Sequence, residues 1–205
     1  MKHILIFLVV GGSTVLLADE IPAGVKIDNE KVKVTVATEQ VHRPGPQHEH
    51  VLNRVMVYLG DGELTYTNAN GKVDKIRFKK GDVGWAPAAK HVSENTSDHV
   101  YQMVEVDIKT KAPSTPPKLS SIDPLKVDPK HYKLEFENDQ VRVVRVRFGP
   151  KEKGVEHEHS LDHLVVYLND QGRGKFGEVR FDPPMKHTEE NALDQAVERI
   201  AIDIK

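Results

Sequence analysis

Short runs in which apolar and polar residues alternate fill most of the chain. In residues 32–36 every second residue is a valine, and similar alternation returns in residues 63–67, 73–78 and 100–108. Such alternation puts the apolar side chains on one face of a half-buried β-strand. The dipeptide Asn70-Gly71 separates two of these runs, which is a strong signal for a β-hairpin. Because no stretch has the period of a long amphipathic helix, the sequence predicts an all-β fold.

The pattern is repeated in the two halves of the chain. Residues 48–61 and 157–170 are identical at eight of 14 positions, and both begin with His-Glu-His. Residues 81–95 align with residues 177–191 without a gap, and both carry a Gly, a Pro, a His and an Asn in the same order. These matches indicate an internal duplication.

Each half offers a set of histidines suited to a metal ion. The two histidines of a His-x-His on a strand point to the same face, and a third histidine follows in each half. Neutral imidazole suits Fe, Mn, Zn and Ni. Without cysteine, the chain has no thiolate to ligate a metal. The candidate ligands to a divalent transition metal are therefore His48, His50 and His91 in the first half, and His157, His159 and His187 in the second.

The residue four positions after each His-x-His shares its face if the strand is regular. It is Arg54 in the first half and His163 in the second. Arg54 cannot ligate a metal, so we expect it to weaken metal binding or to contact an anionic substrate. A β-bulge would instead turn it toward the surface. His163 can supply a fourth ligand. Three further histidines, at positions 42, 99 and 131, have no partner at ligand spacing and are expected to be exposed polar residues.

These paired motifs resemble the two motifs of the cupin family, and their duplication resembles a bicupin. The resemblance covers residues 26–109 and 135–205. It implies two tandem barrels of the jelly-roll, double-stranded β-helix type. The family pattern usually adds a glutamate after the His-x-His, and Arg54 and His163 stand near that place here. With His163 included, the second half resembles the four-histidine cupins that bind manganese or iron.

The second barrel is expected to be the smaller. His50 and His91 are 41 residues apart, whereas His159 and His187 are 28 apart. The missing length is close to that of the predicted hairpin at residues 63–78. An edge strand left unpaired tends to be covered in proteins. The first barrel or a second subunit, as in a homodimer, would cover it.

The first residues predict export. A lysine at position 2, an apolar run and a small residue before Asp19 are typical of a signal peptide cleaved after Ala18. We therefore expect a signal peptide at residues 1–18, a first cupin domain at 19–109, a Pro-rich linker at 110–126 and a second cupin domain at 127–205. The expected location is the bacterial periplasm, with no membrane attachment after cleavage. A net charge of −2 gives no reason to expect nucleic acid as a partner.

The sequence thus predicts an exported metal-binding bicupin with mononuclear, His-rich sites that binds or transforms a small molecule. One alternative is a metal-dependent dioxygenase of the three- or four-histidine type. Others are a metal-assisted isomerase acting on a sugar or other metabolite, and a non-catalytic binder. The absence of an acidic ligand favours the dioxygenase over the isomerase if the protein is an enzyme.

Overall fold

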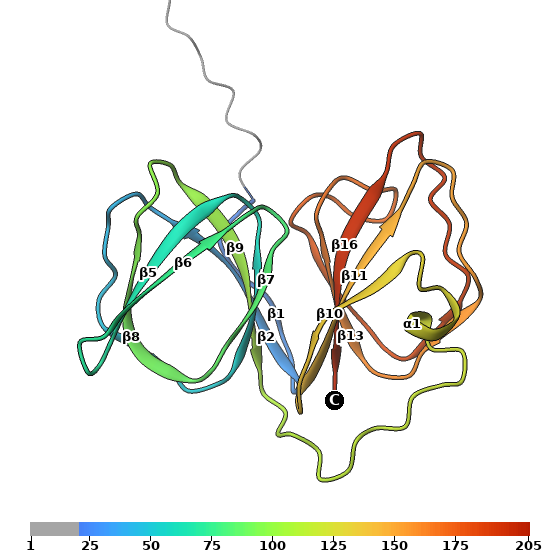
Figure 1. The fold of residues 1–205 in the computed structure, drawn as a ribbon, viewed down its shortest axis with the longest axis horizontal. Helices are drawn as coiled ribbons and strands as arrows, with labels where there is room; N and C mark the ends of the chain where they lie inside the picture. Colours follow the sequence, from blue (N-terminus) through green and yellow to red (C-terminus); the bar gives the residue numbers. More distant parts are fainter. Residues whose placement is uncertain (1–20) are drawn as a thin grey trace, which may run out of the picture.

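The computed structural model describes residues 21–205, so the expected signal peptide at residues 1–18 lies outside the described residues. The described part forms two β-barrels side by side, joined by a long connecting segment (Figure 1). The all-β duplicated fold expected from the sequence is confirmed. Between residues 21 and 205, no helix is long and apolar enough to cross a membrane.

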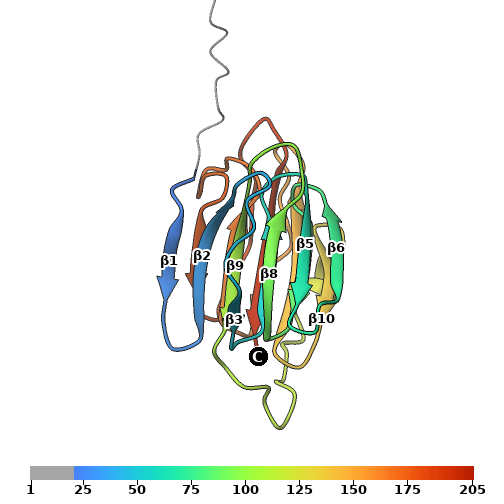
Figure 2. The same cartoon turned by 90° about the vertical axis from the view of Figure 1, so that its left-hand side faces the viewer.

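The first barrel consists of two antiparallel sheets. A five-stranded sheet has the order β1-β2-β9-β4-β7, and a four-stranded sheet has the order β3-β8-β5-β6. Figure 2 shows the four-stranded sheet on the side of the barrel that faces away from its neighbour. The strands are β1 (Gly24–Asp28), β2 (Val32–Glu39), β3 (His48–His50), β4 (Arg54–Tyr58), β5 (Gly62–Asn68), β6 (Val73–Phe78), β7 (Val83–Ala86), β8 (Ala89–Asn95) and β9 (Tyr101–Ile108).

The second barrel repeats this plan without the hairpin. Its five-stranded sheet has the order β10-β11-β16-β13-β14, but its other sheet contains only β12 and β15. The hairpin β5–β6 of the first barrel is replaced by a short turn at residues 171–174. The second barrel is therefore the smaller, as expected. Its strands are β10 (Tyr132–Glu137), β11 (Val141–Phe148), β12 (His157–His159), β13 (His163–Tyr167), β14 (Val179–Asp182), β15 (Met185–His187) and β16 (Val197–Ile204).

The largest hydrophobic core lies between the barrels. One face of each five-stranded sheet turns inward to its own barrel, and the other packs against the opposite sheet. The shared core draws valine, leucine and isoleucine from both halves, among them Val57 and Val106 from the first and Leu164 and Ile202 from the second. Two smaller clusters fill the barrel interiors. Both faces of these strands are therefore buried, one inside the barrel and the other in the shared core.

The contacts at the rim of this shared core are related by the duplication. Lys31 of the first barrel forms an ion pair with Asp162 of the second. At the equivalent positions, Asn53 Nδ2 donates to Gln140 Oε1 at 2.6 Å. Each barrel therefore presents the same surface to the other, as in an isologous dimer. The first barrel covers one sheet of the second, whereas a homodimer stays a prediction.

The segment between the barrels is not extended throughout. Its last part forms one helical turn, α1 (Pro124–Val127), which Asp123 caps by accepting a hydrogen bond from the Leu125 amide. Just before it, Ile122 O accepts from the amide of Glu158 in β12 at 3.0 Å. The end of the predicted linker is therefore packed on the second barrel, close to its histidines.

Candidate functional site

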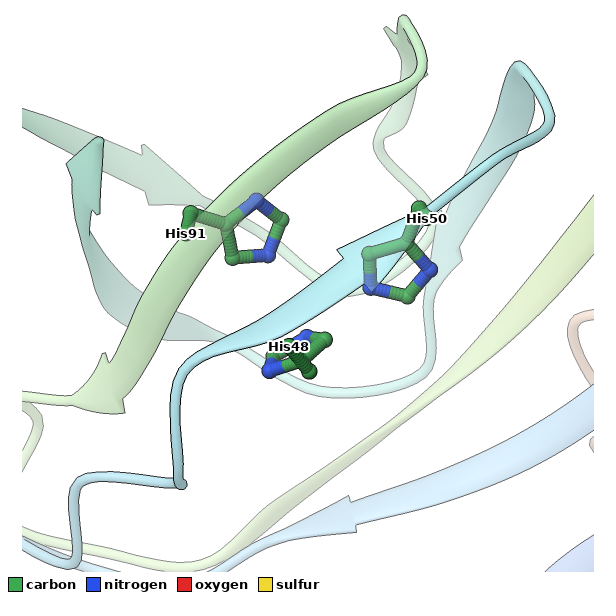
Figure 3. A group of neighbouring side chains, drawn as sticks. All are labelled: His48, His50 and His91. Carbon is green, nitrogen blue, oxygen red and sulfur yellow. The ribbon is translucent and has the colours of Figure 1, made fainter. Parts of the chain in front are cut away.

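Strand pairing brings the histidines of the first half together. His48 lies directly opposite His91 in the β3–β8 ladder, and His50 lies two residues further along β3. Figure 3 shows that the three rings turn toward a common space. One ligand atom from each residue lies within 4.8 Å of the others. The same arrangement recurs in the second barrel, where His157 lies opposite His187 in the β12–β15 ladder.

A backbone hydrogen bond sets the tautomer of the first histidine in each cluster. His48 Nδ1 lies 3.0 Å from Pro46 O, and His157 Nδ1 lies 2.8 Å from Val155 O. Because a carbonyl oxygen can only accept, Nδ1 carries the proton in both rings. Each ring therefore turns the lone pair of Nε2 to the cluster, which is the form that binds a metal.

The second cluster has the geometry of a three-histidine metal site. His157 Nε2 and His187 Nε2 are 2.9 Å apart. Two nitrogens bound at right angles, each about 2.1 Å from a metal, lie about 3.0 Å apart. The three ring planes are also nearly perpendicular, at 79°, 82° and 90°. His159 Nδ1 is buried and has no hydrogen-bond partner among the described residues. This donor set fits a divalent transition metal.

His163 lies beside this cluster without joining its three ligand atoms. Its ring stacks on His159 with the centroids 4.4 Å apart and 19° between the planes. His163 belongs to a neighbouring group with His159 and buried Asp203, in which one ligand atom from each residue lies within 4.8 Å of the others. The Asp203 carboxylate also forms an ion pair with Arg142. His163 as a ligand of the same ion as His157 and His187 stays a prediction. The structure places His163 where it supports the His159 ring.

Arg54 makes the first cluster different. Its side chain is buried, and Nη1 donates to His50 Nε2 at 2.9 Å. This hydrogen bond takes up the lone pair that a metal would need. Nη1 also lies 3.4 Å from Glu105 Oε2. The planes of His50 and His91 are only 28° apart, whereas those of His159 and His187 are perpendicular. The first cluster therefore fits a metal ion less well than the second.

Burial lowers the pKa values of several histidines in the two clusters. Burial, followed by the neighbouring His163, lowers the pKa of His159 to about 2. In the first barrel, burial first and Arg54 second lower the pKa of His50 to about 4. Burial also lowers the pKa of His91 to about 4, with smaller contributions from His48 and Arg54. A histidine already held neutral does not need to lose a proton before it binds a metal.

Sequence reasoning missed a polar network beside the second cluster. The hydroxyl of Tyr132 lies 3.0 Å from His157 Nε2 and donates to Glu189 Oε2 at 2.9 Å. Glu189 also forms an ion pair with Arg199, and this charge lowers the pKa of Glu189 against the effect of burial. At the equivalent positions, the first half carries Ala23, Ser93 and Met103. The sequence signal that could have revealed this network is the difference between the two halves at these three positions. No motif marks it.

Among the histidines outside the clusters, one is buried although the sequence predicted an exposed position. His131 was expected to be exposed, but it is buried and stacks on Phe148 with the centroids 4.0 Å apart. Its Nδ1 lies 2.7 Å from Asp128, and its Nε2 lies 3.2 Å from Glu152. Two carboxylates satisfy both ring nitrogens, so His131 ties the connecting segment to the barrel.

One cavity is lined by the first cluster, and another lies near the second cluster without being lined by its histidines. In the first barrel, a cavity of about 410 Å³ is lined by all three histidines together with Arg54, Tyr66 and Glu105. In the second barrel, a cavity of about 450 Å³ lies where the hairpin is missing and is lined by Arg173, Glu189 and Arg199, among others. Glu189 links this cavity through Tyr132 to His157. A small molecule therefore has space near each cluster.

Comparison with known proteins identifies the fold. No protein-family model and no curated protein sequence matches the chain. Among solved structures, AerE from Microcystis aeruginosa matches with a TM-score of 0.64 and 13% identity, over 89% of this chain and 98% of that protein. A Cupin 2 conserved barrel domain protein from Leptotrichia buccalis matches with a TM-score of 0.54 and 16% identity, over 91% and 90%.

A mutant of the oxalate decarboxylase of Bacillus subtilis is a further match. Its TM-score is 0.60 at 12% identity, over 89% of this chain and 75% of the enzyme. Another structure of that enzyme, studied for its Mn(II) centres, has a TM-score of 0.59 at 12% identity, over 86% and 69%. At these identities the similarity concerns the fold.

Proposed function

By fold the chain is a duplicated cupin, and from that premise we propose that it holds a divalent transition metal on His157, His159 and His187. The observation that carries this proposal is the geometry of the second cluster. Its rings are mutually perpendicular, and two of its Nε2 atoms lie 2.9 Å apart. Three neutral imidazoles suit Fe, Mn, Zn or Ni and leave coordination positions for other ligands. The Mn(II) centres of the oxalate decarboxylase are consistent with this choice.

We further propose that the second barrel binds or transforms a small molecule at this site. A bound metal would supply Lewis-acid chemistry and, if it is redox-active, dioxygen chemistry. The protein's own residues supply a hydroxyl and a carboxylate. Tyr132 donates to Glu189 Oε2, so this carboxylate is placed to accept a proton next to the cluster. Arg199 keeps Glu189 in its charged, accepting form.

This carboxylate revises the balance between the two enzymatic alternatives. In the sequence, the absence of an acidic ligand favoured the dioxygenase over the metal-assisted isomerase, which needs a general base. Glu189 provides one, and therefore supports proton-transfer chemistry as the second candidate beside the dioxygenase. Dioxygen uptake with a panel of metabolites separates them, because an isomerase consumes no dioxygen.

The metal proposal is tested by paired substitutions at duplicated positions. We expect the double substitution of His157 and His159 by Ala to remove the bound metal, as measured by elemental analysis of the purified protein. The same double substitution at His48 and His50 is the matched control, and it should leave most of the metal in place. A metal that binds only the folded state stabilises it, so only the second-barrel variant should lose metal-dependent thermal stability. Equal metal content in the wild type and the second-barrel variant would contradict the proposal.

A further inference from the structure

One cavity of the first barrel is mainly apolar. It has a volume of about 540 Å³ and lies beside β4, β6 and β7. Met56, Ile76, Phe78 and Trp85 form its apolar wall. Its charged lining consists of Arg54 and Arg77 together with Asp74, Asp82 and Glu135. Sites for small molecules typically measure about 300–1,000 Å³ and combine an apolar wall with a few polar groups. The cavity therefore has the size and lining of a ligand site.

Arg54 lines this cavity and carries one buried hydrogen-bond donor without a partner among the described residues. Only 2% of the residue is exposed. Its hydrogen bonds to the described residues come from Nη1 alone, which contacts His50 and Glu105. Nε is buried and has no partner among the described residues. A buried N–H group without a partner costs free energy, so such groups usually serve a ligand or a water molecule. The edge of the guanidinium formed by Nε and Nη2 is the one that a carboxylate binds through two parallel hydrogen bonds.

We infer that this cavity binds a small organic carboxylate with an aromatic or branched apolar body. The carboxylate binds the free edge of Arg54, and the apolar body packs against Met56 and Phe78 inside the barrel. Tyr58 and Tyr66 line the same cavity. This inference goes beyond the proposed metal site, because it concerns the other barrel and requires no metal.

The duplication shows that the site is specific to the first barrel. The position equivalent to Arg54 is His163, whose ring stacks on His159. Ile76 and Phe78 belong to β6, which has no counterpart among the described strands of the second barrel. The charge and half of the apolar wall are therefore absent from the second barrel. We therefore assign the carboxylate to the first barrel and the metal ion to the second.

Trp85 allows a direct test because it is the only tryptophan of the chain and lines the cavity. We expect sodium benzoate to change its fluorescence in a saturable way, measured on the full chain after treatment with a chelator. Benzamide has the same shape without the charge and should bind at least about tenfold more weakly, because charge-assisted hydrogen bonds are roughly twice as strong as neutral ones. Equal binding of the two probes, or no saturable change with benzoate, would overturn the inference.

Substitutions locate the binding group. Arg54→Gln should weaken benzoate binding about tenfold or more. The matched control is Arg77→Gln, because Arg77 lines the same cavity but is exposed and already paired with Glu63. An equal loss in both variants would show that general charge, and not the Arg54 edge, is responsible. If Arg54→Gln does not fold, Ile76→Glu replaces it, since Ile76 is partly exposed and tolerates a charge. The added negative charge should weaken benzoate binding relative to Ile76→Gln, and equal binding would contradict the inference.

Discussion

Two side chains at equivalent positions, Arg54 and His163, distinguish the two histidine clusters. Arg54 donates to His50 Nε2, whereas His163 stacks on His159 and leaves its neighbours' lone pairs free. The guanidinium also places a positive charge next to the point where a cation would bind. At an effective dielectric constant near 20, two such charges about 4 Å apart repel by several kcal/mol. A single substitution can therefore change which barrel binds metal.

Arg54→Glu should raise the metal affinity of the first barrel. The substitution removes the hydrogen bond to His50 and adds a carboxylate that can itself ligate. Titration of the chelator-treated protein with Zn²⁺, in a background where His157 and His159 are replaced by Ala, measures this site alone. Arg77→Glu adds the same charge at an exposed position and serves as the control. An unchanged affinity in Arg54→Glu would show that Arg54 does not control the site.

The buried His159 should make the stability of the metal-free protein depend on pH. Its folded-state pKa is about 2, whereas an imidazole in the unfolded chain titrates near 6.5. Between about pH 6.5 and pH 2, the His159 imidazole is protonated in the unfolded chain but not in the folded protein. The contribution of His159 to the free energy of unfolding is therefore fully present above about pH 6.5 and is lost as the pH falls toward 2. The slope is about 1.4 kcal/mol per pH unit for one such group.

Replacing His159 should therefore reduce the acid sensitivity. Between pH 7 and pH 5 the unfolding free energy of His159→Gln should fall by about 2 kcal/mol less than that of the wild type, because about 1.5 pH units of this window lie below 6.5. Urea unfolding at both pH values measures the difference. Replacing exposed His99 by Gln is the control, because its pKa is raised by Asp98 and not lowered by burial. If the unfolding free energy falls equally in the wild type and in His159→Gln, His159 is not the source of the acid sensitivity.

At the level of the structural elements, each barrel has a turn that contacts the other barrel and contains a glycine with a positive φ. Gly81 and Gly177 occupy equivalent positions and have φ values of +86° and +73°. A Cβ on Gly81 would lie 3.1 Å from Leu168, and a Cβ on Gly177 would lie 3.3 Å from Leu59. Leu59 and Leu168 are also equivalent positions. Each barrel thus packs a leucine on the glycine turn of the other.

Substitution of these glycines should cost more than backbone strain alone. Gly71 in the β5–β6 turn has a φ of +81° and open space around a Cβ, so Gly71→Ala measures the strain by itself, about 1–2 kcal/mol. Gly81→Ala should destabilise the protein by more than this, because the added methyl also presses on Leu168 of the other barrel. Chemical unfolding of the two variants compares the costs. If Gly81→Ala and Gly71→Ala destabilise the protein equally, the contact between Gly81 and Leu168 accommodates the added methyl group and contributes nothing to the loss of stability.

The elements themselves could be predicted from the sequence because strand alternation and turn residues are local signals. The β5–β6 hairpin around Asn70-Gly71 and its loss in the second half follow from residue spacing alone. The partners of the site residues could not be predicted in the same way. Tyr132, Glu189 and Arg199 come from three elements that are far apart in the sequence, and only the fold brings them to His157. The shared core was missed because alternation does not show that a strand's second face is also buried.

At the scale of the whole molecule, export remains a proposal from the first residues. We expect the mature protein to begin near Asp19 and to reside in the bacterial periplasm, because residues 1–18 have the pattern of a cleaved signal peptide. Mass spectrometry of protein recovered from a periplasmic extract, after expression with signal peptidase present, should show the loss of these residues. The matched control replaces Leu8 by Arg, which interrupts the apolar run and should retain the full-length chain in the cytoplasm. Soluble wild-type protein with Met1 intact would contradict the proposal.

The shared core predicts that the two barrels unfold together. Val57 and Val106 of the first barrel and Ile202 of the second are fully buried in one cluster. If one barrel unfolds, the other exposes an entire apolar sheet face to water, at roughly 25 cal/mol per Å². Trp85 belongs to the first barrel and packs against the shared core, so its fluorescence reports on the first barrel's side of that core. Far-ultraviolet circular dichroism reports on both barrels. In the wild type the two signals should therefore show a single unfolding midpoint.

A substitution in the second barrel should then shift the signal of the first. Ile202→Ala removes buried volume from the shared core and should cost about 2–5 kcal/mol. The Trp85 midpoint in urea should fall together with that of the circular dichroism, although Ile202 and Trp85 belong to different barrels. Leu134→Ala, at a half-exposed position of the second barrel, should change both midpoints only slightly. If Ile202→Ala lowers the circular dichroism midpoint while Trp85 keeps its own, the barrels are independent folding units and the shared core does not couple them.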